Sequence, residues 1–185
     1  MGKLIYSGTT SLDGYLNDAD GSFAWSAPDE EVHSFVNDKV RPVGTYLFGR
    51  RMYEVMRVWE TLDTAGEPEV MADFAGIWRD SDKIVYSSTL DATSTSRTRL
   101  ERSFDVDEIA RMKTASDRDL CVGGAGLAAT AIRAGLVDEY HQYLAPIIVG
   151  GGTRFYPDDA LVELELLEEH RFTSGVVYVR YRPRR

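Results

Sequence analysis

The fold class is indicated most clearly by the segment Leu120-Cys121-Val122-Gly123-Gly124-Ala125-Gly126-Leu127. Residues 119–122 are mostly apolar and predict a buried strand. Glycines then turn the chain, and apolar residues recur at helical spacing at Leu127, Ala131, Ile132 and Leu136. Gly135 is suited to end this helix. A buried strand that leads through glycines into a helix is typical of an α/β protein with a parallel sheet.

The same alternation continues on both sides of this stretch. Further strands are expected at 3–8, 45–48, 83–86 and 139–149. The first helix is expected to start at a Ser26 cap, with Pro28 in its first turn, and other helices are expected at 50–59, 67–81 and 107–113. The polar run 91–98 is interpreted as a loop, and 164–172 with 176–182 predicts a hairpin. The order predicts an α/β fold with a mainly parallel sheet and antiparallel strands at its C-terminal end.

Composition narrows the class of protein. A chain of 185 residues suits one domain, 1–185. The formal net charge of −9 argues against a nucleic-acid partner, and the basic residues at 180–185 are interpreted as a solvated chain end. Cys121 is the only cysteine and the three histidines are scattered, so neither an intramolecular disulfide nor a metal site is expected. With no apolar run near the ~20 residues of a membrane span and no signal-peptide pattern, we expect a cytoplasmic protein without a membrane partner.

Three predicted strand ends are suited to bind anions. In a parallel sheet these ends share one edge, where open α/β sheets bind ligands. The residues are Gly49, Arg50 and Arg51; Ser87, Ser88 and Thr89; and Gly123, Gly124, Ala125, Gly126 and Leu127. Glycines let backbone amides approach a phosphate, and the following helix adds its free N–H groups. Each segment also has a simpler interpretation: 123–127 as a tight turn, Arg50 and Arg51 as solvent-facing side chains, and 87–89 as a hydroxyl-rich loop. Together, however, the three segments indicate a phosphate-rich ligand such as a dinucleotide.

Candidates for acid–base chemistry lie near the N-terminus. Asp13 follows the first strand, two residues after Ser11, and also fits a simple turn aspartate. Glu31 and His33 lie in the first turns of the first helix, where acids are commonly solvated helix-start charges. The sequence leaves open which of these groups acts on a substrate.

The set of motifs, taken in order, resembles a known family. The motifs are Ser11-Leu12-Asp13-Gly14-Tyr15, Phe48-Gly49-Arg50-Arg51-Met52-Tyr53-Glu54, Val122-Gly123-Gly124-Ala125-Gly126-Leu127, Gly135-Leu136-Val137-Asp138-Glu139, Ala145-Pro146 and Gly150-Gly151-Gly152. They resemble the C-terminal reductase domain of the bifunctional riboflavin-biosynthesis deaminase-reductase and, more closely, stand-alone proteins of the dihydrofolate-reductase-like superfamily. The resemblance spans residues 3 to about 181.

This resemblance implies a three-layer fold around a sheet of eight or nine strands, NADPH as cofactor, a small-molecule substrate and a homodimer. It places the adenosine and 2′-phosphate of NADPH near Gly49, Arg50, Arg51 and 87–89, and the pyrophosphate at 123–127. It places Ser11 and Asp13 near the nicotinamide and substrate. It also implies a cis peptide between Gly123 and Gly124.

The chain departs from the family pattern at informative places. No zinc deaminase motif is present, so a bifunctional enzyme is not expected. Riboflavin-pathway reductases carry a glutamate just before the glycine pair, where this chain has Val122. Dihydrofolate reductases place a substrate-binding acid on the first helix, where the spacing to Phe35 favours Glu31 and the spacing to Gly49 favours His33.

The resemblance therefore implies an NADPH-dependent oxidoreductase that reduces a heterocyclic or ribosylamino-pyrimidine-like molecule, as a 5-amino-6-(5-phosphoribosylamino)uracil reductase does. Glu31, or alternatively Asp13, would orient or protonate that substrate. The alternatives are a pterin or dihydrofolate reductase, a non-catalytic NADP(H)-binding regulatory module, or a plain dimeric scaffold.

Overall fold

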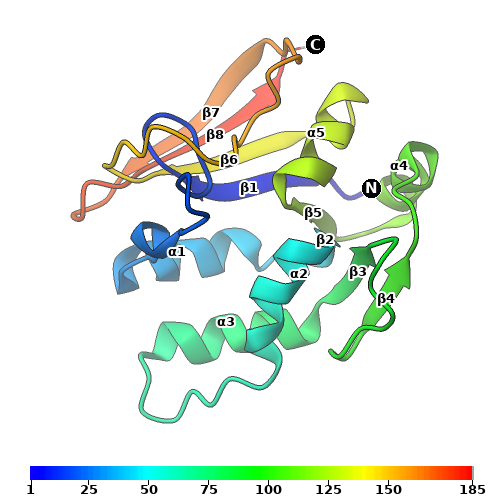
Figure 1. The fold of residues 1–185 in the computed structure, drawn as a ribbon, viewed down its shortest axis with the longest axis horizontal. Coiled ribbons are helices and arrows are strands. Elements are labelled where there is room, and N and C mark those ends of the chain that lie inside the picture. The colour runs from blue at the N-terminus through cyan, green and yellow to red at the C-terminus, as the bar shows by residue number, and fades with distance from the viewer. Residues whose placement is uncertain (185) are drawn as a thin grey trace.

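The computed structural model describes residues 1–184 and consists of one eight-stranded sheet with helices on both faces (Figure 1). The strands are β1 (Leu4–Thr10), β2 (Val43–Gly49), β3 (Asp82–Tyr86), β4 (Thr98–Glu101), β5 (Asp119–Gly123), β6 (Glu139–Leu144), β7 (Leu164–Arg171) and β8 (Val177–Pro183). The α-helices are α1 (Glu30–Val40), α2 (Arg50–Met56), α3 (Glu69–Asp80), α4 (Val106–Ala115) and α5 (Ala125–Arg133). Two short 3₁₀ helices are η1 (Ala24–Ser26) and η2 (Arg57–Glu60).

The strand order is β4-β3-β2-β5-β1-β6-β8-β7. All neighbours from β4 to β6 pair in parallel, whereas β8 is antiparallel to both β6 and β7. The expected parallel sheet with an antiparallel C-terminal hairpin is therefore confirmed. This arrangement brings the carboxyl ends of β1, β2, β3, β5 and β6 to one edge of the sheet.

The core forms two layers of side chains, one on each face of the sheet. On one face, Trp78 and Phe74 of α3 pack on Tyr46 and Phe48 of β2, while α1 packs Val32 near Tyr143. The other face carries α4 and α5, whose buried residues Ile109, Ala128, Ala131 and Ile132 join the cluster of Leu4, Leu47 and Val122. Burying such side chains stabilises the fold by roughly 1.5–3 kcal/mol for each large one. The two layers fix the strands that carry the site.

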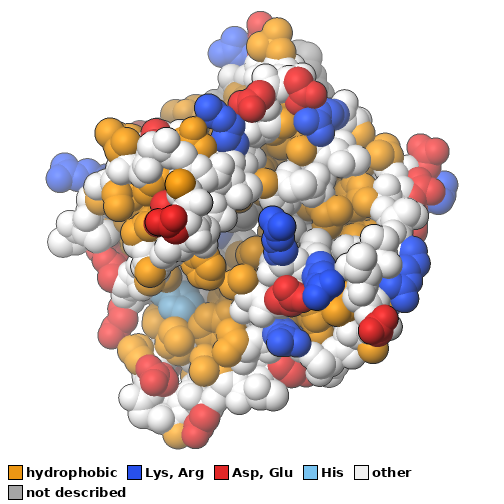
Figure 2. Space-filling view, viewed as in Figure 1, with side chains coloured by type: hydrophobic (Ala, Val, Ile, Leu, Met, Phe, Trp, Pro, Cys, Tyr) orange, Lys and Arg blue, Asp and Glu red, His pale blue; other side chains and the backbone are white. Residues whose placement is uncertain are grey.

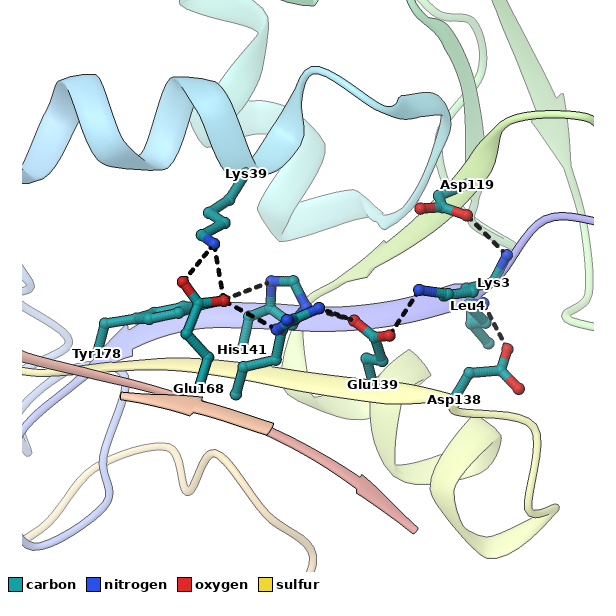
Figure 3. A network of polar contacts seen from close by, with 10 residues as sticks. Lys3, Leu4, Lys39, Asp119, Asp138, Glu139, His141, Glu168 and Tyr178 are labelled. Atoms are coloured by element: carbon teal, nitrogen blue, oxygen red, sulfur yellow. Dashed lines mark hydrogen bonds and ion pairs between the residues drawn. The ribbon is translucent and has the colours of Figure 1, made fainter. Parts of the chain in front are cut away.

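Charged side chains join α1 and β1 to the C-terminal hairpin. Glu139 lies at the start of β6 and binds Lys3 at 2.7 Å, His141 at 3.1 Å and Arg180 at 3.3 Å. Arg180 also contacts Glu168 of β7 at 3.1 Å. Glu168 in turn accepts hydrogen bonds from Lys39 of α1, the nearer at 2.6 Å, as Figure 3 shows. The network ties three separate parts of the chain to the centre of the sheet.

Several expected boundaries were wrong, each for a local reason. The first helix starts at Glu30, because Asp29 accepts the Val32 amide at 2.9 Å and is the N-cap, whereas Ser26 ends η1. β6 stops at Leu144 instead of residue 149, since Pro146 has no N–H with which to continue the ladder. β4 was missed, because this short edge strand is polar and partly exposed. No helix in the described part of the chain is long and apolar enough to cross a membrane.

Candidate functional site

The strand ends that were predicted to bind anions lie side by side. In the register of the sheet, Phe48 pairs with Gly123 and Gly49 pairs with Tyr86. The glycine run after β5, the arginines that open α2 and the hydroxyl residues after β3 therefore share the carboxyl edge of the sheet. This is the edge at which open α/β sheets bind their ligands.

The glycine run combines close packing with an open helix start. A Cβ atom on Gly123 would lie 2.7 Å from the ring of Phe48, so only glycine fits there without a shift of that ring. Gly124 is the N-cap of α5, and no side chain caps the first turn. A Cβ on Gly126 would have no neighbour within 4 Å, so the surface beside the helix start is open. Uncapped amides and open space at a helix N-terminus suit a phosphate group.

The expected cis peptide between Gly123 and Gly124 was wrong, because residues 1–184 contain no cis peptide bond. Gly124 instead adopts a φ of +96°, which is open to glycine at little cost. A positive φ redirects the chain from β5 into α5 while both neighbouring peptides stay trans.

Arg50 joins two of the predicted anion-binding segments. Its guanidinium donates one hydrogen bond to Glu54 at 2.7 Å and another to the hydroxyl of Thr89 at 3.0 Å. Ser87 is buried, and its hydroxyl oxygen accepts the amides of Thr89 and Leu90 at 3.2 and 3.0 Å. Arg51, Ser88 and Thr89 are exposed. The edge therefore presents a cation and hydroxyl groups within one small area.

Arg102 belongs to this area and was missed. It follows β4, and its guanidinium donates to the carbonyl oxygens of Ser87 at 3.1 Å and Leu90 at 2.7 Å. These bonds close the turn that presents Thr89 to Arg50. The sequence signal was weak, because recognising Arg102 as a strand-end residue requires recognising β4 first.

Ser11 and Asp13 lie in the loop after β1, where both make structural contacts. Ser11 is buried, and its hydroxyl oxygen accepts the amide of Tyr15 at 3.0 Å. The carboxylate of Asp13 accepts the amides of Val149 at 3.2 Å and Gly150 at 2.8 Å. A hydrogen bond from Ser11, together with these amides, lowers the pKa of Asp13 against an opposing effect of burial. Asp13 is thus a charged anchor between the loops after β1 and β6.

The same two loops are joined again further along. Asn17 accepts the amide of Thr153 at 2.9 Å through its side chain, and Leu16 donates its amide to the Thr153 carbonyl at 2.8 Å. Gly152 has a φ of +125°, and a Cβ there would lie 1.9 Å from the Asn17 carbonyl oxygen. The glycines at 150–152 therefore permit a close approach between two loops.

Glu31 and His33 of α1 have different surroundings. Glu31 is exposed, and its carboxylate accepts the amide of Thr173, in the turn between β7 and β8, at 3.0 Å. His33 is 7% exposed and lies 6.0 Å from the ring of Trp59 and 5.7 Å from that of Phe74. Burial lowers the pKa of His33, and the negative charge of Asp73 only partly opposes this. His33 therefore favours its neutral form, while Glu31 is held on the hairpin.

The surface over this edge is divided by charge. Figure 2 shows a hollow with hydrophobic side chains and a histidine on the side of α1, and Lys and Arg side chains on the side of α2. Two further recesses lie at the opposite edge of the sheet. The larger, of about 600 Å³, is lined in part by Asp138 and Arg182, and the smaller, of about 360 Å³, by Asp73 and Arg118. We place the candidate site at the carboxyl edge, because the glycine run, Arg50 and the hydroxyl residues converge there.

The chain is similar to known proteins over nearly its whole length. Residues 2–178 match the model of a family described as the RibD C-terminal domain. The uncharacterized protein YyaP of Bacillus subtilis (strain 168) is 24% identical over 182 residues, which cover 97% of this chain and 94% of YyaP.

Solved structures share the fold at lower identity. A protein of Shewanella sp. PV-4 named as a candidate riboflavin biosynthesis protein has a TM-score of 0.75 at 19% identity, with 99% of both chains covered. Dihydrofolate reductase from Enterococcus faecalis, complexed with NADP(H), has a TM-score of 0.64 at 16% identity, covering 100% of this chain and 98% of that one. The bifunctional deaminase and 5-amino-6-(5-phosphoribosylamino)uracil reductase of Thermotoga maritima has a TM-score of 0.67 at 14% identity, and the match covers 57% of its length.

Proposed function

Because the chain belongs to the RibD C-terminal domain family, we propose that it is a reductase that transfers hydride from NADPH to a small heterocyclic molecule. The observation that supports the proposal is that the three strand ends predicted to bind anions converge on one edge of the sheet. In this proposal residues 1–185 form a single reductase domain that works as a homodimer.

The residues at the edge fit a dinucleotide. The uncapped first turn of α5 and the open space at Gly126 suit the pyrophosphate at 123–127. Arg50, held against Thr89, suits the 2′-phosphate that distinguishes NADPH from NADH, together with Arg51 and the exposed hydroxyls of Ser88 and Thr89. Ser87 would shape the turn that presents these hydroxyls. When bound, NADPH would supply the hydride, and the protein would supply position and electrostatics. The nicotinamide would then lie toward the loop of Ser11 and Asp13.

The acid–base partner of the substrate is one of the residues around α1. Glu31 has an ionisable side chain at the surface, whereas His33 lies in the aromatic pocket of Trp59 and Phe74. This chain has Val122 where riboflavin-pathway reductases carry a glutamate, so a riboflavin-type substrate would find no carboxylate at this position. A pterin or dihydrofolate is therefore an alternative substrate. We propose Glu31 as the group that orients or protonates the substrate, with Asp13 as the alternative.

A mutation separates a catalytic Glu31 from a structural one. Glu31→Gln keeps an oxygen that can accept the Thr173 amide, so the hairpin should stay in place. If Glu31 acts on the substrate, turnover should fall at least tenfold while NADPH affinity and Tm stay within error. Thr173→Pro removes the same hydrogen bond from the other side and serves as the structural control. An unchanged rate in Glu31→Gln would remove Glu31 from the mechanism.

A second candidate function is a non-catalytic NADP(H)-binding module. It is favoured by one observation: the carboxylates of Asp13 and Glu31 are both engaged with backbone amides of neighbouring loops. Such a module would bind NADPH tightly but would not oxidise it with any acceptor.

The first test is a titration of NADPH and NADH into the purified protein, followed by calorimetry. Micromolar binding of NADPH and weaker binding of NADH are expected. The NADPH-loaded protein is then supplied with pterin, ribosylaminopyrimidine and carbonyl acceptors, and absorbance at the reduced nicotinamide band reports turnover. Failure to bind either nucleotide would reject both the reductase and the binding module.

A further inference from the structure

The substrate half of the site consists of the loop at 11–23, helix α1 and the loop at 145–153, and this half is poorly suited to phosphate. We propose that the substrate is an uncharged, planar heterocycle without a phosphate group. The inference rests on the proposed function, which puts the nicotinamide between this half and the arginines of α2. It separates this chain from an enzyme that takes a phosphoribosyl substrate.

The first argument is charge. From residue 4 to residue 38 the chain contains no lysine or arginine, and residues 140–153 contain no Lys, Arg, Asp or Glu. The first of these segments contains seven acids: Asp13, Asp18, Asp20, Asp29, Glu30, Glu31 and Asp38. A phosphate dianion brought against this surface would meet repulsion rather than a counter-charge.

The second argument is that three backbone donors in and beside the glycine loop are already used. A run such as Gly150-Gly151-Gly152 could present its amides to a phosphate. Here, however, Asp13 accepts the amides of Val149 and Gly150, and Asn17 accepts that of Thr153. On the other side of the half-site, Glu31 accepts the amide of Thr173. The protein's own side chains therefore take four amide donors that a phosphate could otherwise use.

The third argument is that two cations bordering this half, Arg154 and Lys39, already have acidic partners. Arg154 follows the glycine loop, binds Asp158 at 3.1 Å and stacks on the ring of Tyr15 at 5.1 Å. Lys39, at the far end of α1, binds Glu168 at 2.6 Å. Arg50 and Arg51 open α2 and Arg102 follows β4, so these cations belong to the dinucleotide half of the edge.

The lining of the half-site favours a planar ring. His33, Trp59 and Phe74 form an aromatic group between α1, η2 and α3, with Trp59 only partly buried. Leu12 is 62% exposed and Ile148 is 71% exposed on the paired loops. Aromatic and aliphatic surfaces next to a few hydrogen-bonding groups are the usual lining of sites for small, uncharged heterocycles.

The test compares one heterocycle with and without its phosphate. Calorimetry on the protein saturated with NADP⁺, which prevents turnover, measures the binding of 5-amino-6-ribosylaminouracil and of its 5′-phosphate. The unphosphorylated compound is expected to bind at least tenfold more tightly, and the preference should shrink at high salt because salt screens the repulsion. Equal or tighter binding of the phosphate, or no binding of the unphosphorylated compound, would overturn the inference.

Two variants and one prior measurement keep the outcomes distinct. Arg154→Gln removes the cation that follows the glycine loop, and Arg57→Gln removes the cation of η2, the element that also carries Trp59. Both variants should leave the affinity for the unphosphorylated compound within twofold. If the wild type prefers the phosphate and one variant loses that preference, the substituted arginine is the phosphate ligand and the inference is wrong. The affinity for NADP⁺ is measured first: its absence rejects the proposed function, whereas its presence with a phosphate preference rejects only the substrate class.

Discussion

The guanidinium of Arg50 donates a hydrogen bond to the hydroxyl of Thr89 at 3.0 Å, which connects the carboxyl ends of two neighbouring strands. Arg50 opens a helix, where a positive charge is electrostatically unfavourable, and the carboxylate of Glu54 at 2.7 Å offsets part of this cost. This pair therefore holds a cation in a position that a 2′-phosphate would stabilise.

Arg50→Gln should weaken NADPH binding about tenfold, which corresponds to ~1.4 kcal/mol, and should leave NADH binding nearly unchanged. The physical reason is the loss of a charge-assisted hydrogen bond to a group that NADH lacks. Calorimetric titration of both nucleotides measures the difference. Arg133→Gln is the matched control, because Arg133 is an equally exposed arginine that pairs with Asp159 away from the strand ends. Parallel losses for both nucleotides would show that Arg50 only shapes the loop.

Gly123→Ala should destabilise the apo protein by about 1–3 kcal/mol, because its Cβ would lie 2.7 Å from the ring of Phe48. Thermal unfolding monitored by circular dichroism measures the effect. Gly76→Ala is the control, since Gly76 lies inside α3 and nothing beyond the backbone of its own helix lies within 4 Å of its Cβ position. This control should raise stability by ~0.5–1 kcal/mol. If Gly123→Ala left the stability unchanged, the ring of Phe48 would be able to move aside at little cost.

The aromatic pocket around His33 predicts a dependence of stability on pH. Because burial lowers the pKa of His33 in the folded state, the unfolded chain binds its proton more readily. The contribution of the neutral ring is complete above the unfolded value of 6.5 and is lost as the pH falls through the lower folded pKa. Urea unfolding between pH 7.5 and 5 should show a shallower decline for His33→Gln than for the wild type. Equal slopes for the two proteins would contradict this prediction.

Glu139 should make the fold sensitive to strong acid. Burial raises the pKa of its carboxyl, but the hydrogen bonds from His141 and Lys3 outweigh burial and lower the pKa to about 2. Its stabilisation, roughly 3 kcal/mol, is present above pH 4.5 and is lost as the pH falls from there toward 2. The Glu139→Gln variant should lose a comparable free energy of unfolding at pH 7. Below pH 4.5 its free energy of unfolding, measured with urea, should depend less on pH than that of the wild type. Glu165→Gln, whose half-exposed carboxylate pairs with Arg182, should cost less than ~1 kcal/mol.

The parts of the fold that the sequence predicted are those set by local patterns. Around Val122 and Gly123 the residue types alone predict a change from strand to helix, and the shared edge of parallel strands predicts that the three candidate segments lie close together. β4 escaped prediction because an edge strand does not need a buried apolar face. The same omission concealed Arg102, whose partners are the carbonyls of Ser87 and Leu90.

The roles of the acids depend on contacts between distant segments, which sequence patterns do not encode. Asp13 fits a turn residue by its neighbours, yet its carboxylate binds amides of the loop after β6. Glu31 fits a helix-start charge, yet it holds the turn after β7. The backbone at Gly124 was likewise not predictable from the sequence, because a positive φ is found there instead of the expected cis peptide.

The central position of β1 sets the order in which this protein can be completed during its synthesis. Leu4 pairs with Leu120 and Ile5 pairs with Glu139, so both neighbours of the first strand are translated long after it. Until residues 119–144 have been translated, β1 has no strand on either side, and its unpaired backbone N–H and C=O groups stay available to wrong partners. The sheet can close only when the glycine run and the strand after it have emerged. A nascent chain that stalls before residue 119 would therefore be a substrate for chaperones and proteases rather than a partly working enzyme.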